Sequence, residues 1–167
     1  SLHIAKIQTS NLTLAWSEEK RHFGSAIHIK LPDSLAREQF ELTIEYETAH
    51  GSQCLALDWI CPAGKSPIVY SQCQAIHARS LFPCQDTPAI KQTYSASVEC
   101  TGQPQMTVLM SALAAGTCAK DENGVFHFAQ PIPIPSYLFA ICCADIQAQE
   151  LGKRCCIYAE GSIFAKA

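Results

Sequence analysis

Two glutamines, Gln72 and Gln74, are the residues whose type and spacing best suit ligand binding. They flank Cys73, and because alternate residues of an extended strand point to one side, both amides are expected to face the same way. An amide oxygen accepts a hydrogen bond from an ammonium group, and the amide NH2 group donates to a carbonyl oxygen. The alternative is that both amides only satisfy backbone groups at a sheet edge.

A histidine and a cysteine follow this pair, and Cys84 with His77 as its base could form a nucleophilic site. The sequence offers no third group that would orient the histidine and no oxyanion-hole motif. Cys84 also lies between Pro83 and Gln85, in a segment that proline makes rigid. We therefore interpret both side chains as structural.

The charged residues of the same segment are Arg79 and Asp86, which lie on either side of a corner at residues 82–84. A partly buried charge needs a partner, so the two predict an ion pair that clamps the loop. Direct contact with a substrate is the alternative. Pro83 and Pro88 fix φ and lack an N–H donor, so the loop between them is expected to be rigid and outside any strand ladder.

Residues 70–94 read YSQCQAIHARSLFPCQDTPAIKQTY, and this run resembles the N-terminal domain of zinc aminopeptidases of the gluzincin class, peptidase family M1. The similarity is closest to the branch of leukotriene A4 hydrolase and aminopeptidase B. It rests on residues 71–77, Arg79, residues 83–88, Lys91 and Tyr94, with weaker similarity at 57–59 and 133–138.

The resemblance implies that this domain forms one wall of a substrate cleft, with Gln72 and Gln74 beside the N-terminal amine of a bound peptide. Many relatives outside this branch carry Glu at the position of Gln74. The neutral amide lowers the local negative charge, which suits a cleft that accepts more than one class of substrate. The implied activity of the intact enzyme is removal of N-terminal residues from peptides by zinc-activated water.

In the family, zinc is held by a helix with the motif His-Glu-x-x-His and a downstream Glu. None of the six histidines of this chain starts such a motif. In the family that helix lies beyond the point where this chain ends. We therefore expect no catalytic and no metal-binding residue here, zinc only in the full-length enzyme, and no activity for this stretch alone.

The charge and composition of the chain argue against some classes of binding partner. The chain has 167 residues, a formal net charge of -3 and only 12 Lys and Arg, which are scattered. This pattern argues against nucleic acid and anionic membranes, and no apolar run approaches the roughly 18 residues of a membrane span. The expected partners are a peptide substrate and the catalytic domain of the same polypeptide. Without an initiating Met or a signal peptide, the chain is expected to be an excised piece.

Ten cysteines raise the question of a disulfide scaffold. Cys142–Cys143 and Cys155–Cys156 are vicinal pairs, which rarely form their own bridge because neighbours on a strand point to opposite faces. They also lack the C-x2-C spacing of a metal cluster. Most of the others lie in apolar runs, where free Cys behaves as a small hydrophobe. Reduced thiols and a cytoplasmic location are expected, with a secreted disulfide-bonded domain as the alternative.

Short apolar and alternating runs separated by turns predict an all-β fold, an antiparallel β-sandwich or a twisted saddle-shaped sheet. The charged run 17–21 reads as a loop or hairpin end, 105–110 with 125–130 as a hairpin-like pair, and 137–146 as either strand or helix. The prolines of 131–135 exclude a central strand. The predicted strands are 2–7, 12–16, 27–31, 40–47, 54–60, 69–74, 91–100, 105–110, 125–130 and 153–159.

Residues 1–167 are expected to form a single N-terminal β domain of a larger multidomain metallopeptidase. The family resemblance implies that strands before Leu2 are missing, which leaves the sheet incomplete at its N-terminal edge. A free-standing, non-catalytic β-sandwich that acts as a binding or regulatory module is the alternative. The two differ in whether a large apolar surface is exposed for docking on a catalytic domain.

Overall fold

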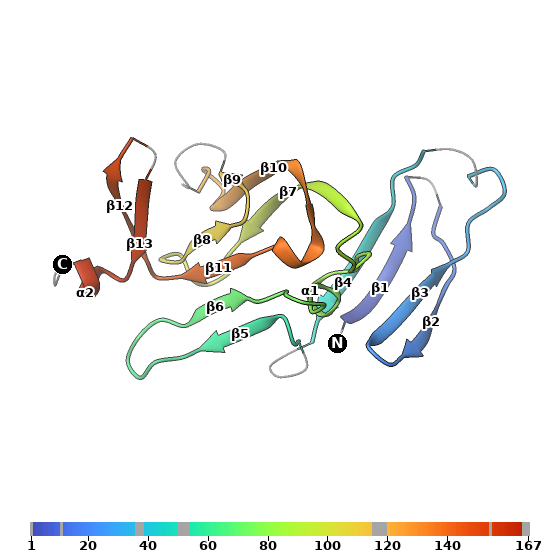
Figure 1. Cartoon of the computed structure of the whole chain (residues 1–167), viewed down its shortest axis with the longest axis horizontal. Helices are drawn as coiled ribbons and strands as arrows, with labels where there is room; N and C mark the ends of the chain where they lie inside the picture. Colours follow the sequence, from blue (N-terminus) through green and yellow to red (C-terminus); the bar gives the residue numbers. More distant parts are fainter. Residues whose placement is uncertain are drawn as a thin grey trace.

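The structure is a computed structural model that describes residues 2–10, 12–35, 39–49, 54–114, 120–153 and 155–164. Within these ranges it is built almost entirely of antiparallel strands, so the all-β class is confirmed. The molecule is elongated, and its C-terminal hairpin and its N-terminal strands lie at opposite ends (Figure 1). No helix in the described part of the chain is long and apolar enough to cross a membrane.

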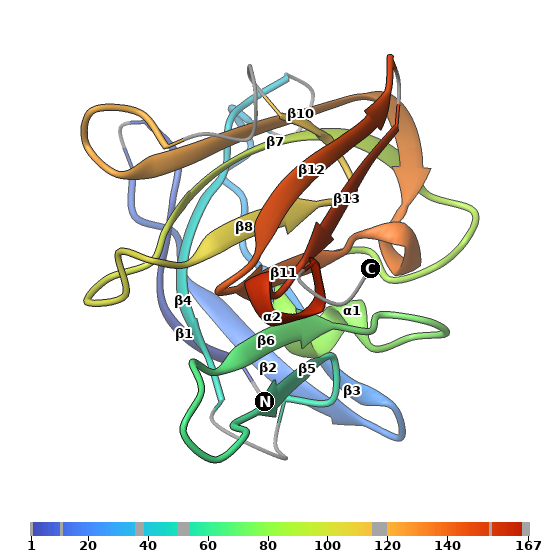
Figure 2. The ribbon, with the colours of Figure 1, turned by 90° about the vertical axis from the view of Figure 1, so that its left-hand side faces the viewer.

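The described residues form five separate sheets. Figure 2 looks along the long axis, with the C-terminal hairpin nearest the viewer. The strands are β1 (Leu2–Gln8), β2 (Trp16–Arg21), β3 (Gly24–Ile29), β4 (Thr43–Thr48), β5 (Leu57–Ile60), β6 (Ile68–Ser71), β7 (Lys91–Glu99), β8 (Thr107–Met110), β9 (Leu113–Ala114), β10 (Val125–Pro135), β11 (Ile141–Ala144), β12 (Gln147–Gly152) and β13 (Cys155–Ala159). The same part of the chain contains the short helices α1 (Ala78–Leu81), a 3-10 helix (Ser136–Leu138) and α2 (Gly161–Phe164).

The main core lies between two of the sheets, with strand order β7-β10-β9 in one and β5-β6-β11-β8 in the other. Val108 of β8 and Phe126 and Phe128 of β10 are at most 4% exposed and form its centre. Side chains from both sheets surround them, which is the arrangement of a β-sandwich. As predicted for 91–100, alternate residues of β7 point inward: Tyr94, Ala96, Val98 and then Cys100.

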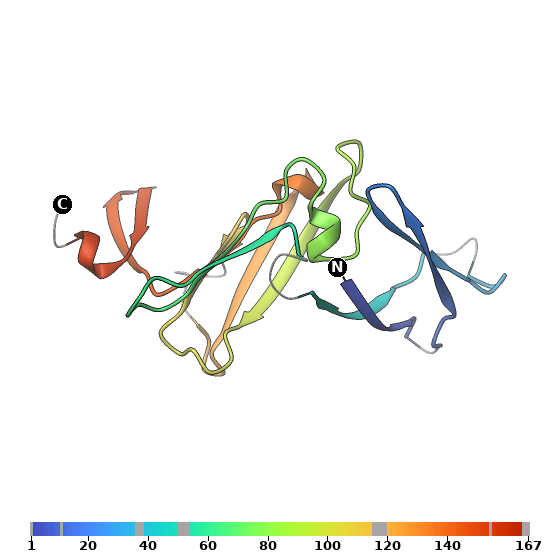
Figure 3. The same ribbon diagram turned by 90° about the horizontal axis from the view of Figure 1, so that it is seen from below.

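Two hairpin-like pairs form the N-terminal end, β1 with β4 and β2 with β3. Helix α1 lies between this end and the sandwich (Figure 3). The apolar side chains that alternate in and before β4 are only partly buried. Leu42, just before the strand, keeps 38% of its surface exposed, and Tyr46 keeps 39%. At the other end, β12 pairs with β13 to make the C-terminal hairpin.

Several sequence predictions about single elements were wrong. The second strand does not occupy 12–16; it begins at Trp16 and continues through the charged segment 17–21. Of the two predictions for that segment, a loop is wrong and a hairpin end is confirmed, since β2 pairs with β3 in a hairpin whose solvated charges pair locally. Segments 105–110 and 125–130 do not pair, since β8 joins β11 and β10 joins β7 and β9. The ambiguous segment 137–146 contains the end of the 3-10 helix followed by strand β11.

The proline-rich segment is extended, as predicted, and forms the second half of β10. Its ladder with β7 is interrupted between Gln130 and Ile134, where the register shifts. In the described residues, β9 pairs with β10 at Phe128 and Ala129 and does not reach the prolines. This position agrees with the missing N–H donor of proline.

Candidate substrate-binding site

Gln72 and Gln74 lie on the segment that leads from β6 to α1. Strand β6 ends at Ser71, but the alternation continues: Cys73 is 2% exposed, whereas both glutamines are exposed. The Gln72 N–H donates to the Ala56 carbonyl at 2.8 Å, and the His77 N–H donates to the Cys73 carbonyl at 2.9 Å. The backbone is therefore fixed on the buried side while the two amides face outward. The Gln74–Ala75 peptide bond is cis.

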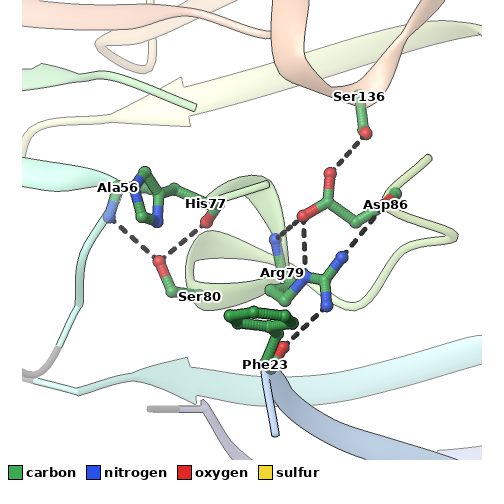
Figure 4. Close-up of polar contacts among 7 residues, drawn as sticks. All are labelled: Phe23, Ala56, His77, Arg79, Ser80, Asp86 and Ser136. Carbon is green, nitrogen blue, oxygen red and sulfur yellow. Dashed lines mark hydrogen bonds and ion pairs between the residues drawn. The ribbon is translucent and has the colours of Figure 1, made fainter. Parts of the chain in front are cut away.

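The buried anchor of this segment is a small core of Ala56, Cys73 and Ala78, each at most 2% exposed. Ser80 of α1 joins it through polar contacts that Figure 4 shows. Its hydroxyl accepts from the Ala56 N–H at 2.9 Å and donates to the His77 carbonyl at 2.8 Å. Because Ser80 is only 4% exposed, these bonds satisfy groups that water cannot reach.

The ion pair predicted between Arg79 and Asp86 is present (Figure 4). Arg79 belongs to α1, the helix that follows the glutamine segment. Asp86 accepts from the backbone N–H and the Nε of Arg79 at 3.1 and 3.0 Å. It also accepts from the Ser136 hydroxyl at 2.6 Å. Burial raises the pKa of Asp86, but the hydrogen bonds from Ser136 and Arg79 outweigh burial and hold the pKa below its ordinary value.

Arg79 connects this network to the N-terminal end of the molecule. Its guanidinium donates to the Phe23 carbonyl, in the β2–β3 turn, at 2.6 Å. The aliphatic part of the side chain passes close to Gly24, where a Cβ atom would lie 3.2 Å from Arg79 Cδ. Arg79 thus joins α1, the loop of Asp86 and the β2–β3 hairpin. Phe23, Ser80 and Ser136 could not be found from the sequence, because each contact depends on long-range packing.

The cysteines near the site are not activated nucleophiles. Burial, followed by the negative charge of Asp86, raises the pKa of Cys84 to about 12 and that of Cys73 to about 11. A nucleophilic cysteine needs a lowered pKa. Among the described residues no hydrogen bond joins His77 to Cys84, which agrees with a structural role for both.

Neither glutamine side chain makes a hydrogen bond within the described part of the chain. Both amides are therefore available to a ligand. In the same described ranges, no three His, Cys, Asp or Glu side chains gather as a metal site would require. His50 lies outside these ranges.

An apolar cavity lies elsewhere in the molecule. It has a volume of about 400 Å³ and lies between β4, β7 and the segment 134–139, with Tyr46, Phe82 and Tyr94 in its wall. Gln72 and Gln74 do not line it, and both residues are exposed at the surface. An open surface is what a single wall of a cleft presents when the opposite wall belongs to another part of a protein.

Residues 2–138 match the family of the peptidase M1 N-terminal domain. This chain belongs to that family. The match includes the glutamine pair, the Arg79–Asp86 ion pair and the proline-rich part of β10. It ends at the 3-10 helix, so the strands from β11 onward lie outside it.

Similar proteins agree with this assignment. The chain is 41% identical over 140 residues to leucine aminopeptidase 2 of Neurospora crassa, covering 80% of this chain and 20% of that protein. It is 40% identical to a leukotriene A-4 hydrolase homolog of Botryotinia fuckeliana, covering 86% and 24%. The structure of leukotriene A4 hydrolase from Saccharomyces cerevisiae superposes with a TM-score of 0.82 at 31% identity, over 96% of this chain and 24% of the other. The chain thus spans about a quarter or less of these relatives.

Proposed function

We propose that this domain is the substrate-binding wall of a zinc-dependent aminopeptidase related to leukotriene A4 hydrolase. The intact enzyme removes N-terminal residues from peptides. Its zinc supplies an activated water and is held by a catalytic domain of the same polypeptide, outside this chain. The names of the relatives, leucine aminopeptidase 2 and leukotriene A-4 hydrolase homolog, support this activity.

Gln72 and Gln74 bind the peptide's N-terminal end in this proposal, and one observation carries it. Two exposed amides, which have no hydrogen-bond partner among the described residues, flank a cysteine that is 2% exposed, on a backbone fixed by buried hydrogen bonds. A backbone that is fixed before binding strengthens a polar contact, because the protein loses little conformational entropy when the ligand binds. An amide oxygen accepts from the peptide's ammonium group, and an amide NH2 donates to its first carbonyl.

Arg79, Pro83, Asp86 and Pro88 serve as the support of this wall. Arg79 and Asp86 use their polar atoms on each other and on neighbouring backbone and serine groups. Asp86 is only 3% exposed, so it is poorly placed to meet a substrate. We therefore assign the four residues to the geometry of the loop and not to substrate contact.

Docking on a catalytic domain is favoured over a free-standing module by the exposed apolar residues of β5. Trp59 and Ile60 keep 58% and 46% of their surface exposed, and Leu55, just before the strand, keeps 65%. Within the described ranges, strand β5 is an edge strand of its sheet, with β6 as its single neighbour. A catalytic domain packed there would remove this surface from water.

We place the enzyme in the cytoplasm. The nine cysteines that the structure describes are free thiols, as expected in a reducing compartment. Cys118 lies outside the described residues.

The proposed function is tested by steady-state kinetics on the intact enzyme. A hydrogen bond to a charged group contributes about 1.5–3 kcal/mol, so Gln74→Ala is expected to raise KM for peptides roughly tenfold. The kcat should fall less than KM rises, because the contact holds the substrate before reaction. The matched control is Gln149→Ala on the exposed strand β12. An unchanged KM would remove Gln74 from the site, and activity that survives a metal chelator would remove zinc from the mechanism.

A further inference from the structure

Two cysteines from different sheets meet inside the sandwich. Cys100 directly follows β7, Cys143 belongs to β11, and their sulfur atoms are 3.0 Å apart. Both side chains are partly buried and pack against the core of Val108, Phe126 and Phe128. They are 43 positions apart in the sequence, so only the packing of the two sheets brings them together.

A positive charge lies beside the pair. The Lys120 ammonium sits 5.4 Å from the centre of the Phe126 ring, which packs in the same core. It also donates to the carbonyl of Pro104, in the turn that follows Cys100. Burial and the hydrogen bond with Cys100 raise the pKa of Cys143 to about 12, while Lys120 opposes them. Cys143 therefore keeps its proton, and its thiol lies within hydrogen-bond distance of the Cys100 sulfur.

The neighbouring Cys142 provides an internal comparison. It occupies the next position on β11, where side chains point to the opposite face of the sheet. It pairs with Tyr70 and Leu109 on the adjacent strands and is not part of the sandwich core. Of the two vicinal cysteines, only Cys143 contacts Cys100.

We propose that Cys100 and Cys143 form a reversible disulfide that links the two sheets when the protein meets a peroxide. The Cys100 thiolate attacks one oxygen of hydrogen peroxide, the O–O bond breaks, hydroxide leaves, and Cys100 becomes a sulfenic acid. The Cys143 sulfur then attacks the Cys100 sulfur. The S–O bond breaks, water leaves with the Cys143 proton, and the S–S bond forms. Two electrons pass from the two sulfurs to the peroxide, and two thiols of a monothiol reductant return them.

The proposed disulfide suits a reversible response to oxidation and not permanent stabilisation of the fold. Disulfides in a reducing compartment are transient and often redox-sensing. The cross-link would act on β11, whose Ile141 N–H donates to the Ser71 hydroxyl at 2.9 Å. Ser71 is the last residue of β6, directly before Gln72. Oxidation thus fixes the strand next to the segment that presents the glutamines.

The test is disulfide mapping of the intact purified protein after brief exposure to hydrogen peroxide. Free thiols are alkylated after unfolding, and the peptides are identified by mass spectrometry with and without reduction. We expect the Cys100 and Cys143 peptides to be joined, two hydrogens lighter than the sum of the reduced peptides, and to separate on reduction. Cys100→Ala and Cys143→Ala should each abolish this species, whereas Cys142→Ala should keep it.

Mapping of the unmodified sequence does not depend on whether the variants fold. Recovery of Cys100 and Cys143 as separate alkylated peptides, while the exposed Cys61, Cys155 or Cys156 are oxidised, would overturn the proposal. A bridge from Cys100 to Cys142 would also overturn it, because that pairing contradicts the orientation of β11.

Discussion

Arg79 and Asp86 are joined by three hydrogen bonds: the backbone N–H and Nε of Arg79 both donate to Asp86 Oδ2, and one guanidinium NH2 donates to the Asp86 carbonyl. The pair closes the loop that follows α1, and Ser136 and Phe23 attach it to two other parts of the fold. The segment with Gln72 and Gln74 therefore rests on a support with contacts in both the sandwich and the N-terminal hairpin.

Removing the carboxylate should open this loop. In Asp86→Ala, Arg79 and Ser136 lose their acceptor, and a hydrogen bond to a charged group contributes about 1.5–3 kcal/mol. The Arg79 side chain is 36% exposed, so water replaces part of the lost hydrogen bonding. We therefore expect the free energy of local opening to fall by about 2 kcal/mol. Hydrogen exchange of the peptide that spans residues 73–90 measures the free energy of local opening. Asp33→Ala, at an exposed position, is the control, and an equal effect of both substitutions would disprove the support role.

The stabilisation that the Asp86 carboxylate gives to this loop should decrease at low pH. The pKa of Asp86 is below its ordinary value in the folded protein, so its contribution is complete above the unfolded pKa of about 3.9. That contribution is lost as the pH falls through the lower, folded pKa. The opening free energy of the 73–90 peptide, corrected for intrinsic exchange, should thus be level from pH 7 to about pH 5 and decline below about pH 4. Asp86→Asn should lack this decline; a decline of the same size in the variant would assign it to other groups.

Gly24 should tolerate no side chain. Its φ of +117° is in the region that favours glycine, and a Cβ would approach Arg79 Cδ to 3.2 Å. We expect Gly24→Ala to cost about 1–3 kcal/mol, measured by thermal unfolding of the intact protein. Gly102→Ala is the matched control, because Gly102 has a φ of +72° and no atom near the added Cβ. If both substitutions cost the same, the contact with Arg79 carries no stability.

Some features of the fold can be predicted from the sequence because they depend only on residues close together in the chain. The alternation of Tyr94, Ala96 and Val98 in β7 requires only that one face be buried, and the structure confirms it. The prolines of 131–135 likewise restrict the second half of β10 through their own chemistry: in the described residues β9 pairs with β10 before the prolines and not along them. Arg79 and Asp86 could be paired because only seven positions separate them.

The remainder depends on contacts that no local pattern encodes. Strand β2 is charged on both faces and looks like a loop, and β12 is fully exposed and shows no alternation. Strand β10 pairs with β7 and β9 and not with β8, a choice made by the packing of two sheets. Ser80 and Phe23 matter only because the folded chain brings Ala56 and Arg79 to them.

The central claim is that Gln74 binds the N-terminal amine of the substrate. Its most direct test is whether Gln74 interacts with the amine of a bound ligand. Inhibition constants are measured on the intact enzyme for a peptide-like inhibitor and for its analogue without the N-terminal amine, with the wild type and with Gln74→Ala. If Gln74 binds the amine, losing the amine should weaken inhibition of the wild type roughly fivefold more than of the variant, a coupling of about 1 kcal/mol. An equal loss in both enzymes would contradict the claim.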